Sequence, residues 1–150
     1  MKMSGDLRVK TSRRRKALFK DICDAVFPQN SHELFFLCAC LGYREEVSIP
    51  LSRDGEEQFW SKTITYDEYT CYYSMILKDS GFDMSSLSDD AVVIKRIEEY
   101  ANGGLDFLAR EVIPDLIVES EGEERILPAS KKMLPKTLLF SAVNHIPPCP

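Results

Sequence analysis

The sequence lacks the long apolar runs that a membrane-spanning helix requires. Its longest apolar run, from Leu34 to Leu41, has eight residues, whereas a membrane helix needs about 20. The opening residues MKMSGDLRVK also lack the apolar core of a secretory signal. We therefore expect a cytoplasmic protein that has no membrane partner.

Histidine is scarce, and the cysteines are not spaced as metal ligands. The chain has two histidines and five cysteines. Cys38 and Cys40 lie two positions apart in a segment with a helical pattern, so they face different directions and cannot chelate one ion together. An odd number of cysteines, most of them among apolar residues, is typical of reduced cytoplasmic thiols. The sequence predicts no bound metal and no cofactor.

No set of residues in the sequence points convincingly to catalysis. Two histidines offer few general bases, and no cysteine has a recognisable histidine partner motif. Asp115 followed by Glu119 resembles the start of a restriction-nuclease carboxylate motif, but Glu121 stands where that motif has lysine. We predict a protein that is not an enzyme. A small nuclease subunit that depends on Asp115 and Glu119 is an alternative.

What the sequence does contain is a marked separation of charge. Residues 1–20 carry eight basic side chains and one acid, Asp6, so this segment is +7 and the other 130 residues of the −5 chain carry −12. A basic segment on an acidic body typically meets an anionic partner. A solvated flexible arm and a docking site for an acidic protein are the alternatives. The candidate DNA-binding residues are Arg8, Lys10, Arg13, Arg14, Arg15 and Lys16.

Hydrophobic periodicity predicts a mainly α fold, a single helical domain with a short N-terminal strand. Residues 7–11 alternate apolar and basic side chains, as a strand with one buried face does. Helical spacing follows from Ser12 onward, and Asn30 resembles the start of a capping box for an apolar helix over 31–41 that Gly42 ends. Further helices are expected over 65–77, from Ser88 onward and over 105–116.

Composition divides the chain into two parts. We expect residues 1–118 to form the helical domain with its basic N-terminal arm. Residues 119–150 begin with an acidic linker and are rich in proline, which opposes long regular elements. We predict that this second part is an acidic linker followed by an irregular Pro-rich tail. Its prolines are Pro128, Pro135, Pro147, Pro148 and Pro150.

Two stretches resemble a known family when taken together. They are LFFLCACLGYR at 34–44 and IEEYANGGLDFL at 97–108. Their order and separation resemble the DNA phosphorothioation-associated proteins of the group called dnd system-associated protein 4. The similarity covers roughly residues 7–116. In the second stretch, Asn102-Gly103-Gly104 interrupts a helical pattern, which indicates either a helix break with positive φ or a close approach of another backbone.

This resemblance implies a bacterial accessory protein that works beside systems replacing a phosphate oxygen of DNA with sulfur, or using that mark to exclude phage DNA. It implies no catalytic residues. We therefore expect a non-enzymatic accessory subunit of a DNA-modification or anti-phage restriction system. Its basic segment would contact DNA, and its acidic body would contact other subunits of that system.

The strand–helix–helix order at the start is also that of ribbon-helix-helix DNA binders, in which two chains pair their strands. In that arrangement Arg8 and Lys10 would face DNA, Leu7 and Val9 would lie in the dimer core, and residues 13–15 would contact phosphates. A transcriptional regulator is therefore an alternative function. A strand that pairs with its twin also leads us to expect a homo-oligomer.

Overall fold

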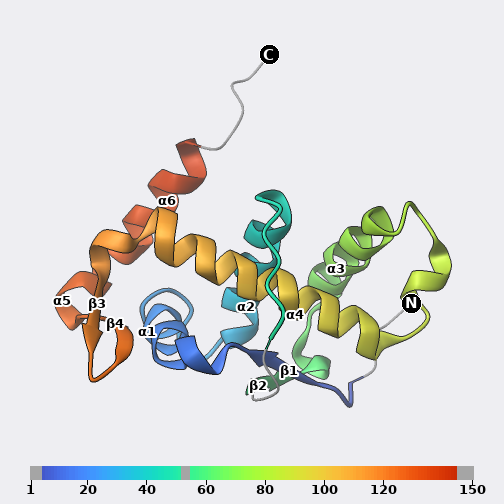
Figure 1. Cartoon of the computed structure of the whole chain (residues 1–150), viewed down its shortest axis with the longest axis horizontal. Coiled ribbons are helices and arrows are strands. Elements are labelled where there is room, and N and C mark those ends of the chain that lie inside the picture. Colours follow the sequence, from blue (N-terminus) through green and yellow to red (C-terminus); the bar gives the residue numbers. More distant parts are fainter. Residues whose placement is uncertain (1–4, 52–54, 145–150) are drawn as a thin grey trace.

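Two long helices, α2 and α4, cross at the centre of the molecule (Figure 1). The computed structural model describes residues 5–51 and 55–144. Short 3-10 turns (η1, η2, η3, η5) and one π-helical turn (η4) join the longer elements. In chain order the elements are β1 (Arg8–Thr11), η1 (Arg13–Arg15), α1 (Lys16–Val26), α2 (Ser31–Arg44), β2 (Glu56–Trp60), η2 (Ser61–Thr63), α3 (Tyr66–Asp79), η3 (Met84–Leu87), α4 (Asp90–Phe107), η4 (Leu108–Val112), η5 (Pro114–Leu116), β3 (Ile117–Ser120), β4 (Glu123–Ile126), α5 (Pro128–Lys131) and α6 (Leu134–Asn144).

The helices α2 and α4 form the core, which confirms the prediction of a mainly α single domain. Helix α2 is apolar on most of its surface and buries Leu34, Phe35, Cys38 and Ala39. Exposing apolar surface to water is unfavourable, so a helix that is apolar on most sides is stable only when other elements surround it. No helix among the described residues is long and apolar enough to span a membrane.

Glycines allow α2 and α4 to approach closely. A Cβ atom on Gly42 would collide with the carbonyl oxygen of Tyr100. A Cβ atom on Gly104 would collide with the carbonyl oxygen of Cys38, and it would lie 2.9 Å from the backbone nitrogen of Gly42. The crossing therefore depends on the absence of side chains at both positions.

Two predictions about these glycines are corrected by the structure. Gly42 does not end its helix, because α2 continues to Arg44. The Asn102-Gly103-Gly104 segment does not interrupt α4, and its glycines are not among the described residues with positive φ. The alternative, close approach of another backbone, is confirmed, since Gly103 also lies against the backbone of Val47.

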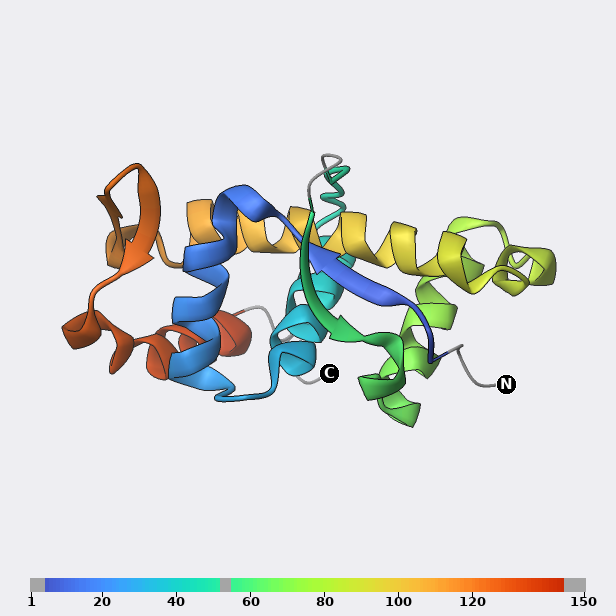
Figure 2. The same ribbon diagram turned by 90° about the horizontal axis from the view of Figure 1, so that it is seen from below.

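The N-terminal strand is present as predicted, but its partner lies in the same chain. Strand β1 pairs antiparallel with β2, and Val9 faces Phe59 in the core. Within β1, the backbone nitrogen of Lys10 donates a 2.6 Å hydrogen bond to Glu98 of α4. The order strand, helix, helix is confirmed, whereas the strand pairing differs from the two-chain ribbon that a ribbon-helix-helix protein requires. Figure 2 shows the β1–β2 ribbon lying across α4.

Helix starts follow the capping signals of the sequence in part. The helix expected from Ser88 onward is α4, and Asp89 caps it by accepting a 2.9 Å hydrogen bond from Ala91 N. Thr65 and Glu68 form a reciprocal capping box at the start of α3. The capping box predicted at Asn30 is wrong, because the Asn30 side chain forms no capping hydrogen bond.

The chain beyond residue 118 is more regular than the predicted linker and irregular tail. The boundary at 118/119 falls inside β3, which pairs with β4 as a hairpin, and α5 and α6 follow. Ile126 and Leu134 are 2% and 0% exposed, so this part shares the core. The prolines permit this because Pro128 and Pro135 occupy first turns, where a missing N–H costs little. Pro147, Pro148 and Pro150 lie outside the described residues.

Candidate nucleic-acid interface and a polar cleft

Arg15, one of the six predicted DNA contacts, is buried inside the protein. Its side chain is 10% exposed, with Nη1 2.6 Å from Asp106 Oδ1 and Nε 3.1 Å from Glu124 Oε1. Burial opposes the charged form, but these two carboxylates outweigh it and raise the pKa of Arg15 above its ordinary value. Arg15 thus joins η1 to α4 and β4 and does not reach a DNA surface.

Arg8 and Lys10 belong to the β1–β2 ribbon. The Arg8 guanidinium lies 4.6 Å from the centre of the Trp60 ring, and its Nε is 3.3 Å from Glu57 Oε2 without forming a hydrogen bond. Cation–π stacking across the strand pair therefore holds this arginine. Lys10 is half-buried, and its backbone is tied to Glu98.

The other three predicted contacts are exposed on η1 and at the start of α1. Arg13 and Lys16 share the carboxylate of Glu56, at 3.6 Å and 3.1 Å, and both side chains are 59% exposed. Arg14 is exposed in the same turn, and so is Lys20 one turn further along α1. Surface ion pairs such as those of Glu56 contribute about 0–1 kcal/mol, so a phosphate can replace this carboxylate. Arg13, Arg14, Lys16 and Lys20 form what we call the cationic surface.

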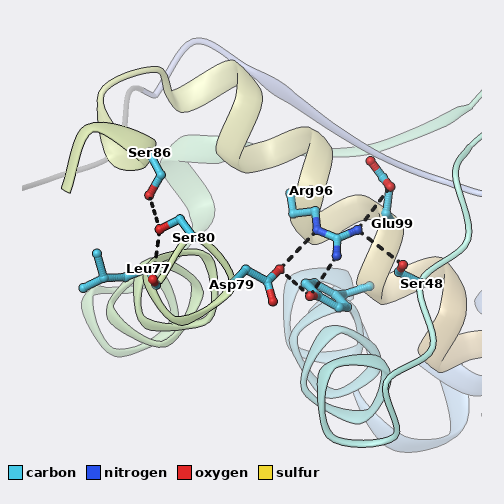
Figure 3. Close-up of polar contacts among 8 residues, drawn as sticks. Ser48, Leu77, Asp79, Ser80, Ser86, Arg96 and Glu99 are labelled. Atoms are coloured by element: carbon cyan, nitrogen blue, oxygen red, sulfur yellow. Dashed lines mark hydrogen bonds and ion pairs between the residues drawn. The ribbon is translucent and has the colours of Figure 1, made fainter. Parts of the chain in front are cut away.

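A polar cleft of about 720 Å³ lies where the C-terminal ends of α2 and α3 meet α4. Arg96 lines this cleft and has polar partners from several elements (Figure 3). It donates hydrogen bonds to Asp79 at 3.2 Å, to Ser48 at 3.3 Å and to Glu99 at 3.4 Å. These contacts hold α3 and the 46–51 connection against α4.

Tyr100 completes this network from beneath Arg96. The guanidinium lies 4.4 Å from the centre of the Tyr100 ring and donates a 3.0 Å hydrogen bond to its hydroxyl oxygen. The Tyr100 hydroxyl in turn donates to Asp79. Burial, followed by the charge and hydrogen bond of Asp79, raises the pKa of Tyr100 to about 12, so the phenol stays neutral at physiological pH. Asp79, Arg96 and Tyr100 are thus bonded to one another, which makes this network a structural joint between α3 and α4.

The two residues of the nuclease alternative lie on consecutive elements near the end of the helical part of the chain. Asp115 and Glu119 are both exposed, on η5 and β3. Over residues 5–51 and 55–144, no three His, Cys, Asp or Glu side chains lie close enough to hold a metal ion. Burial raises the pKa of Cys38 to about 12 and that of Cys40 to about 11, so both thiols remain protonated at neutral pH.

The sequence did not reveal the Arg96 network, the burial of Arg15 or the place of Lys20 in the cationic surface. The Arg96 network has no local signature, because Ser48, Asp79 and Arg96 come from three separate segments. The burial of Arg15 also depends on carboxylates about 90 and 110 positions away in the chain. Only Lys20 carried a usable signal, since it lies one helical turn after Lys16.

Searches of protein-family models, of curated proteins and of solved structures find no match to this chain.

Proposed function

We propose that this chain is a non-enzymatic accessory protein that binds the phosphate backbone of DNA through its cationic surface. The observation that carries the proposal is the exposure of four cations along consecutive elements, Arg13 and Arg14 on η1 and Lys16 and Lys20 on the first turns of α1. Cations supply the sequence-independent part of DNA affinity by releasing counterions from phosphates.

The cationic surface is held in place by its neighbours. Arg15 is anchored on Asp106 and Glu124, and β1 is paired with β2, so both sides of η1 are fixed to the body. Side chains carried by a fixed turn lose less conformational entropy on binding than those of a mobile arm. The remaining 130 residues carry a net charge of −12, which disfavours DNA contact elsewhere and orients the protein on the duplex.

The role we propose for this binding is that of an accessory subunit in a DNA phosphorothioation-linked modification or anti-phage restriction system. The cationic surface would contact DNA while the acidic body contacts another subunit. Such a subunit needs no preferred sequence, because phosphate contacts carry no base information. A transcriptional regulator, in contrast, holds one operator at nanomolar affinity.

DNA binding is tested by fluorescence anisotropy of a labelled duplex over about 50–300 mM salt. We expect the intact protein to bind with a steep salt dependence. The Arg13→Ala/Arg14→Ala/Lys16→Ala variant should reduce the slope of log K against log salt by about 2–3. A matched control, Lys62→Ala/Lys78→Ala/Lys95→Ala, removes the same charge from exposed positions elsewhere and should retain most of the affinity.

The outcomes separate the alternatives. Equal loss of binding in both variants would show that net charge alone matters, and absence of binding by the intact protein would refute the proposal. Tight binding to one duplex sequence would favour the regulator. Substrates with and without phosphorothioate then show whether the sulfur mark changes affinity.

A further inference from the structure

Exposed large apolar side chains are concentrated at two places on the surface. Nine are found among the described residues, and seven of these lie in two groups. One group is on the turn between α3 and α4 and the start of α4, and the other is on α6 and the residues that flank α5. Figures 1 and 2 both show the α3–α4 turn at one end of the long axis and α5 at the other, with α6 running from that end back toward the middle. The remaining two exposed side chains are Trp60, against which Arg8 stacks, and Tyr66.

The first group, which we call the aspartate end, combines apolar and acidic side chains. Phe82, Met84 and Val92 are 71%, 64% and 59% exposed. Residues 79–94 contain four aspartates and no basic residue, and Asp83 and Asp89 are exposed among the apolar side chains. This end is acidic and apolar at once.

Hydrogen bonds hold the aspartate end in shape. The Ser80 hydroxyl donates to the carbonyl of Leu77 at 2.9 Å and lies 3.1 Å from the Ser86 hydroxyl (Figure 3). Asp83 accepts a hydrogen bond from Ser85 N at 3.0 Å. The turn therefore presents Phe82 and Met84 to solvent from an ordered backbone.

The second group, which we call the lysine end, has the opposite charge. Residues 127–144 contain three lysines and no acidic residue. Lys131 turns inward, with Nζ 3.4 Å from Asp21 Oδ1, while Lys132 and Lys136 are exposed. The exposed apolar side chains of this end are Leu127, Met133, Leu139 and Phe140, at 52%, 58%, 64% and 69%.

Helix α6 presents two faces of different kind at the lysine end. Leu134 is fully buried and Leu138 packs partly against the core, so one face is docked on the body. Leu139 and Phe140 occupy the opposite face. An apolar face of this kind on an ordered helix marks an interaction site when it is contiguous and rimmed by charge.

We propose that the lysine end of one copy binds the aspartate end of the next, so that the chain assembles head to tail. Each end offers apolar side chains for burial and the charge that complements the other end. In a symmetric dimer formed through one type of end, that end would meet the same end of the other copy, and like charges would face one another. Because the two ends lie far apart on one molecule, the partner is a second copy, and repetition of the contact gives a filament or a closed ring.

Self-association is measured by sedimentation velocity over about 1–100 µM protein and about 50–500 mM salt. We expect the average mass to rise with concentration and to fall with salt. The aspartate-end variant Phe82→Asn/Met84→Ser and the lysine-end variant Leu139→Ser/Phe140→Ser should each remain monomeric. Asparagine is chosen at position 82 because Phe82 has a φ of +67°, which asparagine tolerates.

Mixing the two variants distinguishes head-to-tail contact from non-specific association. Each variant retains one intact end, so an equimolar mixture should form 1:1 dimers and nothing larger. A mixture that remains monomeric would overturn the proposal, and so would a wild-type protein that is monomeric throughout the concentration range. Symmetric dimers formed by either variant alone would overturn it as well.

A charge variant that preserves local structure tests the contact without a loss of assembly that unfolding could explain. Asp83→Asn/Asp89→Asn retains both capping hydrogen bonds, since asparagine caps helices as well as aspartate does. It should weaken assembly at low salt about tenfold while leaving the melting temperature unchanged. Unchanged assembly at low salt would contradict the complementary-charge basis of the contact.

Discussion

The centre of the molecule and its two ends are built in opposite ways. Where α2 crosses α4, backbone touches backbone, and not even a methyl group fits at Gly42 or Gly104. At the ends, Phe82 and Phe140 stand 71% and 69% exposed with only solvent around most of the ring. The crossing leaves no room for a side chain at these two positions, whereas the ends have apolar surface that nothing in the described chain covers.

This difference implies that the centre governs the stability of the fold and the ends govern association with other molecules. Close packing at the crossing means that a small change of volume there must move a helix. Side chains at the ends contribute little to folding because they remain in water in the folded state. Substitutions at the centre should therefore change the free energy of unfolding, and substitutions at the ends should change association.

The largest expected effect is that of Gly104→Ala. The new Cβ would collide with the Cys38 carbonyl, so one helix must shift. We expect the free energy of unfolding to fall by about 3 kcal/mol, despite the gain of up to about 1 kcal/mol that alanine brings to a helix. Urea titration measures it. Lys95→Ala, an exposed control on α4, should change stability by less than about 0.5 kcal/mol. Equal stability of both variants would show that the crossing can widen without cost.

The second effect concerns Asp21, which attaches the C-terminal region to α1. This carboxylate is 1% exposed and accepts hydrogen bonds from Arg125 at 2.8 and 3.0 Å and from Ile126 N at 3.0 Å. Asp21→Asn should lower the free energy of unfolding by about 2 kcal/mol, because an amide nitrogen would face the guanidinium. Asp24→Asn, exposed on the same helix, is the control.

The contribution of Asp21 should also depend on pH. Burial alone would raise its pKa, but Arg125, Ile126 N and Lys131 together lower it below its ordinary value of 3.8. The stabilisation is therefore complete above pH 3.8 and is lost as the pH falls through the lowered pKa. The stability difference between wild type and Asp21→Asn should shrink in that acidic range. A difference that stays constant down to low pH would contradict this assignment.

The smallest effect is expected for Glu98, which links α4 to β1. Burial raises the pKa of Glu98 from 4.5 to about 7, against the opposing hydrogen bond from Lys10 N. The folded state holds this proton more tightly than the unfolded state, so stability should fall as the pH rises from 4.5 to about 7.

Glu98→Gln removes this dependence. Relative to wild type, the variant should gain about 1–2 kcal/mol across the same range, since partial exposure reduces the effect below that of a fully buried group. Thermal melting at a series of pH values measures it, with the exposed Glu119→Gln as control. A constant difference from wild type at all pH values would refute the raised pKa.

Much of the fold could be predicted from local patterns. Three local patterns correspond to elements of the structure: the alternation at 7–11, the apolar run at 34–41 and the helix start at Asp89. Boundaries were predicted less well. Glycine ends many helices, which favours a helix end at Gly42, whereas in the structure Gly42 lets another helix approach.

The candidate site shows the same division. The sequence alone predicted that basic residues gather near the N-terminus, and Arg13, Arg14 and Lys16 are exposed there. It could not single out Arg15, because three consecutive arginines look alike until distant carboxylates select one of them for burial.

By itself, the sequence determined the mainly α character, the N-terminal strand and the charge separation, because each follows from periodicity or composition over neighbouring residues. Only the tertiary structure decided which cations remain exposed and why the glycines of α2 and α4 are needed. It also decided that exposed apolar side chains lie beside acidic residues at one end and beside lysines at the other. Those features depend on contacts between segments far apart in the chain, and local preferences carry no information about them.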